Sequence, residues 1–96
     1  MALFPPIDFE DFSGSITTGG TAQDVYPTDA HPIEGLEFYN TSDTVMYIDW
    51  DRPATPTKGI PVQPGQGWFS TVSLVPKGRM SVLCATTGKT FVCKLM

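Results

Sequence analysis

The sequence predicts an all-β protein, a small antiparallel β-sandwich of about six or seven short strands with an extended N-terminal arm. Between residues 36 and 95, apolar and polar side chains alternate in short runs, as in half-buried strands. Nearly every run is closed by Gly, Pro or Asn, and such turn signals recur about every 8 to 12 residues in sandwiches and small barrels. The sandwich is favoured over a small open barrel. Residues 1–20 lack this alternation.

The chain of 96 residues is long enough for one hydrophobic core. We therefore divide it into an arm, residues 1–20, and a sandwich domain, residues 21–96. A domain of this size buries only about two thirds of its unfolded surface, so binding to a partner would add to a modest stability.

Seven segments are expected to be strands, and turn chemistry separates them. Pro27 ends the first strand, because proline supplies no donor to a sheet. Asn40 opens a strongly polar turn, and Pro64-Gly65 suits the central pair of a type II turn. The polar, proline-containing stretch 52–59 is expected to be an exposed loop. The predicted strands are residues 21–26, 34–39, 45–51, 60–62, 67–74, 82–85 and 91–94.

The last two predicted strands are expected to pair as a hairpin around Gly88-Lys89, a pair that suits a type II′ turn. In that register Cys84 lies opposite Cys93 in a pair whose Cα atoms approach to about 4.5 Å, which makes a disulfide sterically conceivable. Two reduced, buried thiols are the favoured alternative, since both cysteines share a face with apolar residues. The predicted core comprises Leu36, Phe38, Met46, Ile48, Trp50, Val62, Trp68, Val72, Met80, Val82, Cys84, Phe91, Cys93 and Leu95.

The arm is rich in apolar side chains for a segment without a regular pattern. Two prolines and a Ser-Gly-Ser stretch argue against a helix there. Disordered segments are depleted in aromatic residues, so these rings need an explanation. Either they cover the domain's own core, or they dock on another protein. The candidate partner-binding residues are Phe4, Ile7, Phe9 and Phe12.

Charge and composition narrow the function. Ten acidic and six scattered basic residues give a net charge of −4, which argues against a nucleic-acid partner. The sequence has no basic leader and no apolar run of the ~18 residues that a membrane helix needs. We expect a protein that is not secreted, not membrane-bound and without a cofactor.

No recognised catalytic arrangement is present, so we expect no enzymatic activity. The single histidine, His31, precedes a proline in a predicted loop, whereas a catalytic triad needs a base, a nucleophile and an orienting group. Asp43, Asp49 and Asp51 are the best carboxylate set, and a weak Ca²⁺ site there is one alternative, since calcium takes six to eight oxygen ligands. The favoured interpretation is that these charges keep an outer face soluble, and no metal site is predicted.

Three aromatic residues, Tyr39, Tyr47 and Phe69, fall on faces opposite to the predicted core. Exposed rings can form a stacking surface for sugars. A glycan-binding surface at these residues is therefore an alternative to a purely structural role.

Four stretches carry a resemblance to a known group of proteins: residues 35–42, 45–50, 54–56 and 59–65. They contain an N-x-S turn between two strands, an exposed Pro/Thr loop and a G-x-P-x-x-P-G stretch before the last strands. This pattern, over about residues 21–95, resembles small accessory virion proteins of tailed bacteriophages.

The resemblance implies a structural virion protein, made in the host bacterial cytoplasm, that decorates or cements the capsid. Its partner would be the major capsid protein or another virion protein, bound through the arm, since aromatic anchors often dominate interface energy. A homo-oligomer is expected, and a trimer would match a capsid symmetry axis. The alternatives are a glycan- or receptor-binding module of a phage fibre and a tail or neck component.

Overall fold

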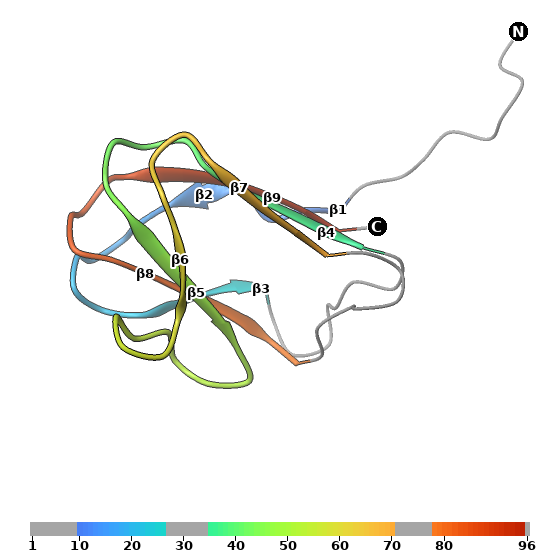
Figure 1. The fold of residues 1–96 in the computed structure, drawn as a ribbon, viewed down its shortest axis with the longest axis horizontal. Coiled ribbons are helices and arrows are strands. Elements are labelled where there is room, and N and C mark those ends of the chain that lie inside the picture. The colour runs from blue at the N-terminus through green and yellow to red at the C-terminus, as the bar shows by residue number, and fades with distance from the viewer. Residues whose placement is uncertain (1–9, 27–34, 71–77, 96) are drawn as a thin grey trace, which may run out of the picture.

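The computed structural model describes residues 10–26, 35–70 and 78–95, which fold into two antiparallel sheets packed face to face (Figure 1). Within these ranges there are nine strands and no helix. The strands are β1 (Glu10–Asp11), β2 (Gly14–Ser15), β3 (Gln23–Tyr26), β4 (Leu36–Asn40), β5 (Met46–Trp50), β6 (Ile60–Val62), β7 (Gly67–Ser70), β8 (Met80–Cys84) and β9 (Thr90–Leu95).

The first sheet has the order β1-β9-β4-β7, and β2 also pairs with β9. Because β1 and β2 lie against the same neighbour, they are two segments of one interrupted edge strand. The second sheet has the order β3-β8-β5-β6. The predicted antiparallel sandwich is confirmed, with eight strand positions where about six or seven were expected.

Consecutive strands lie in opposite sheets, except at the β5–β6 hairpin and at the break between β1 and β2. The connected pairs β2/β3, β8/β9, β4/β5 and β6/β7 therefore lie side by side as four arches. This is the strand order of a jelly roll, an eight-stranded sandwich of two Greek keys. The seven strands predicted from the sequence correspond to β3–β9.

The hairpin predicted for the last two strands is wrong. Strand β8 lies between β3 and β5, whereas β9 lies in the other sheet between β4 and the β1–β2 edge. Cys84 is opposite Met46 and Cys93 is opposite Phe38, and both thiols are free and buried. Alternation shows which side chains face the core, but an arch and a hairpin bury the same side chains.

The second half of the predicted arm belongs to the sandwich. Ile16 donates its N–H to the carbonyl of Lys89 (2.8 Å) and accepts from the N–H of Gly88 (2.8 Å), so the β2–β3 and β8–β9 arches are joined. A Cβ on Gly19 would lie 2.5 Å from the carbonyl oxygen of Ala85, so the two backbones meet only at a glycine. The sandwich therefore includes residues 10–20, whereas the prediction places them in the arm.

Asn40 joins the β4–β5 arch to the β6–β7 arch. Its buried side chain donates to the carbonyls of Thr44 (2.8 Å) and Val62 (2.9 Å), and its Oδ1 accepts from the N–H of Ser42 (3.0 Å). The Asn40 carbonyl accepts from the N–H of Gly65 (2.8 Å). A hydrogen bond from the Gln66 N–H to the Gln63 carbonyl closes the next turn, in which Gly65 has φ +76°. The predicted type II turn at Pro64-Gly65 is thus confirmed.

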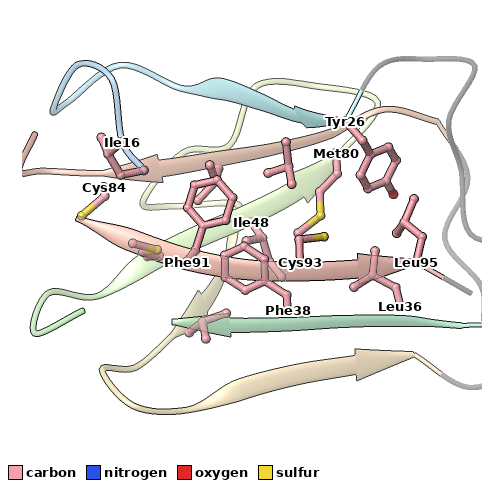
Figure 2. Packing of buried hydrophobic residues seen from close by; sticks show 14 residues of the cluster. Ile16, Tyr26, Leu36, Phe38, Ile48, Met80, Cys84, Phe91, Cys93 and Leu95 are labelled. Atoms are coloured by element: carbon pink, nitrogen blue, oxygen red, sulfur yellow. The ribbon is translucent and has the colours of Figure 1, made fainter. Parts of the chain in front are cut away.

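The core fills the space between the sheets, and Figure 2 shows side chains from both sheets pointing into it. At its centre the rings of Phe38 and Phe91 stack, with centroids 5.6 Å apart. The buried apolar residues are Ile16, Val25, Tyr26, Leu36, Phe38, Met46, Ile48, Ala54, Val62, Met80, Val82, Cys84, Phe91, Cys93 and Leu95.

This list confirms most of the predicted core and corrects its margins. Trp50 and Trp68 are only partly buried, and their rings meet across the two sheets with centroids 4.8 Å apart. Val72 lies outside the described residues. The buried residues that were not predicted are Ile16, Val25, Tyr26 and Ala54, because the sequence around them shows no alternation.

Both thiols should be inaccessible in the native protein. Burial raises the pKa of Cys93 to about 12, whereas a cysteine in an unfolded chain titrates near pH 8.5. The unfolded state therefore loses this proton first, and stability should fall as the pH rises above about 8.5. We expect Ellman's reagent to label the thiols only after denaturation. We also expect the free energy of unfolding of Cys93→Val, measured by denaturant titration, to fall less than that of the wild type as the pH rises. Rapid labelling of native protein would contradict this burial.

Candidate functional site

Two aromatic rings lie exposed together on the outer face of the first sheet. Tyr39 of β4 is 36% exposed and Phe69 of β7 is 53% exposed. Their centroids are 5.2 Å apart and their planes meet at 76°, an edge-to-face arrangement. The structure thus brings together two of the three residues predicted for surface recognition.

Gly67 makes room for this pair. It lies opposite Tyr39, and a Cβ at this position would come within 2.9 Å of ring atoms of both Tyr39 and Phe69. Without that Cβ, one ring atom of each residue can approach the Gly67 backbone closely. A glycine inside a strand often marks such a close approach, but the sequence alone did not show what approaches Gly67.

A row of outward-facing side chains runs from the aromatic pair across the first sheet. Phe69 is opposite Glu37, Glu37 is opposite Lys94, and Lys94 is opposite Asp11. Lys94 forms an ion pair with Asp11 at 2.9 Å. Hydrogen bonds from Ser13, together with this ammonium, hold the pKa of Asp11 well below its usual range. No described residue forms an ion pair with Glu37.

Tyr47, the third residue predicted for surface recognition, does not join this site. It lies on β5 in the second sheet, opposite Leu83 of β8 and Pro61 of β6, and is only half-exposed. Its neighbours Met46 and Ile48 point into the core, so Tyr47 faces outward on the other side of the sandwich. One surface cannot contain all three rings.

Phe12, predicted to bind a partner, packs instead against its own domain. Its ring lies 5.7 Å from that of Tyr26, and its N–H donates to the carbonyl of Cys93 at 2.9 Å. Of the two explanations offered for the rings of the arm, Phe12 follows the first, which is coverage of the core. The other candidates, Phe4, Ile7 and Phe9, lie outside the described residues, as does His31.

The three aspartates considered as calcium ligands do not converge. Asp43, before β5, pairs with Lys89 at 2.7 Å, whereas Asp49, near its other end, pairs with Arg52 at 3.7 Å. A strand advances about 3.3 Å per residue, which keeps these two carboxylates well apart. Within residues 10–26, 35–70 and 78–95, no cluster of three His, Cys, Asp or Glu side chains could hold a metal ion.

Comparisons with protein-family models, curated proteins and solved structures gave no match for this chain. None of the segments that the structure describes forms a helix able to cross a bilayer. The same segments enclose no pocket. The candidate site is accordingly defined by what is present on the surface, namely Tyr39, Phe69, Gly67 and the adjacent Glu37.

Proposed function

We propose that this chain is a structural virion protein of a tailed bacteriophage that decorates or cements the capsid by docking on the major capsid protein. The observation that carries the proposal is the jelly-roll strand order, which recurs in viral capsid proteins and in lectins. A fold alone does not determine a function, so the proposal also depends on the resemblance to accessory virion proteins.

The turns that carry this resemblance build the scaffold. The N-x-S turn begins at the buried Asn40, and the Pro64-Gly65 turn is hydrogen-bonded to the same residue. The Pro/Thr loop is anchored by Ser81, whose hydroxyl donates to the carbonyl of Arg52 at 2.7 Å. The stretches that carry the resemblance are therefore structural in this chain, and recognition of the partner must come from other residues.

Under this proposal the docking residues are Phe4, Ile7 and Phe9, which precede β1 at the edge of the first sheet. Phe12 is excluded, because it packs on Tyr26. Buried aromatic anchors commonly contribute most of the binding energy of an interface. The partner would be the major capsid protein, and the protein would act as a homo-oligomer, for which a trimer fits capsid symmetry.

The test is a triple substitution of Phe4, Ile7 and Phe9 by serine, since a deletion extending to Phe12 would also remove β1. We expect an unchanged melting temperature and at least about tenfold weaker cosedimentation with particles that lack the protein, as for loss of hot-spot residues. Ile60→Ser is the matched control, since Ile60 is an exposed apolar residue of β6. Wild-type binding by the triple variant, or antibody labelling of the tail in electron micrographs, would contradict the proposal.

A further inference from the structure

We propose that Tyr39, Phe69 and Glu37 form a carbohydrate subsite that binds a neutral pyranose unit of a glycan. This activity is separate from attachment to the capsid, and it is assigned to other residues than Phe4, Ile7 and Phe9. It is argued from the rings, the glycine beneath them and the carboxylate beside them.

The two rings form the walls of a corner. Their planes meet at 76°, so a ligand that stacks on the face of one ring also touches the other. The C–H face of a pyranose is apolar and fits the negative face of an aromatic ring. The absence of a Cβ at Gly67 lets both rings pack over its backbone and against each other, which limits the rotamer freedom that a ligand would otherwise have to restrict.

Glu37 supplies the polar part of the subsite. It lies directly opposite Phe69 on the neighbouring strand, on the same outer face. No described residue forms an ion pair with it, because Lys94, opposite it on β9, pairs with Asp11 instead. A carboxylate accepts hydrogen bonds through both oxygens, which suits the hydroxyl groups around a sugar ring. The Glu37 carboxylate and the net charge of −4 disfavour an acidic sugar, so a neutral unit is the fitting ligand.

The size of the patch favours a sugar over a protein. A fully covered aromatic side chain buries about 150 to 250 Å². Because Tyr39 is 36% exposed and Phe69 53% exposed, the pair offers about 200 Å². A stable protein interface needs about 800 Å² per partner, and covering this patch with protein would also desolvate Glu37.

The test is a screen of the full chain on an array of neutral and acidic oligosaccharides, followed by calorimetry with the neutral oligosaccharide that binds most strongly. We expect binding to neutral glycans, a loss of at least about tenfold in affinity for Phe69→Ala, and a smaller loss for Glu37→Gln. Tyr47→Ala is the matched control, because this tyrosine faces outward from the other sheet. Its affinity should equal that of the wild type.

Gly67→Ala tests the position of the two rings separately from their presence. It retains both rings, but its Cβ would displace them from where they now lie. We expect it to weaken binding by about tenfold, and circular dichroism should show that each variant remains folded. Absence of binding to every neutral glycan, binding to acidic glycans alone, undiminished binding by Phe69→Ala, or an equal loss with Tyr47→Ala would each overturn the proposal. The capsid-docking proposal would be unaffected, since it is tested with other residues.

Discussion

Replacing Asn40 by alanine is expected to destabilise the protein by about 3 kcal/mol. The substitution removes the side-chain donor to the carbonyls of Thr44 and Val62, of which the Thr44 carbonyl keeps the Ser42 hydroxyl as a donor at 3.0 Å. The N–H and the hydroxyl of Ser42 both lose the Asn40 Oδ1 as an acceptor. Each buried polar group left unsatisfied costs about 1 to 3 kcal/mol. For a domain of this size, the melting temperature should fall by about 12 to 24 °C, as measured by calorimetry or circular dichroism.

Two further substitutions identify the origin of that loss. Asn40→Asp has nearly the same shape but supplies no donor, so it should destabilise the protein about as much as alanine does. Ser42→Ala removes one hydroxyl in a half-buried position and should cost about 1 kcal/mol. If the free energy of unfolding of Asn40→Ala lies within about 1 kcal/mol of the wild-type value, the joint between the two arches does not depend on this side chain.

Replacing Phe38 by alanine is expected to cost about 3 to 5 kcal/mol, the usual range for truncating a buried phenylalanine. Phe38 is fully buried and stacks on Phe91, so the truncation removes apolar burial and leaves a cavity between the sheets. A loss of this size is a large part of the stability of a small domain. Denaturant unfolding followed by tryptophan fluorescence measures it.

The adjacent Tyr39 provides the control for Phe38. Tyr39→Ala changes a larger side chain one residue further along β4, but on the outer face, where most substitutions have small effects. We expect it to cost less than about 1 kcal/mol, mainly from its edge-to-face contact with Phe69. Equal losses for the two variants would show that the faces of β4 have been assigned wrongly.

The positions of β3–β9 and most of the core could be predicted, because alternation and turn residues are local properties of the sequence. The pairing of strands could not. Strands β8 and β9 are joined by a short polar segment with Gly88, which is equally compatible with a hairpin and with an arch between sheets. In the arch, Gly88 and Lys89 form hydrogen bonds with Ile16, a residue more than 70 positions away in sequence. Such long-range contacts leave no periodic signal.

The candidate site was predictable to the same extent. Alternation placed Tyr39, Tyr47 and Phe69 on outward faces, and this is confirmed. It could not show that Tyr47 belongs to the other sheet, because sheet membership depends on pairing. Gly67 gave no signal beyond its presence in a strand, and Phe12 lay in a segment whose strands are only two residues long.

The pairing of β1 with β9 has a consequence for synthesis of the protein. Glu10 lies opposite Leu95, and β9 occupies an interior position of the first sheet with neighbours on both sides. During synthesis, β1 cannot be hydrogen-bonded in the first sheet until β9 has emerged from the ribosome. The first sheet is thus completed late, with the millisecond to second rates typical of all-β topologies dominated by distant contacts.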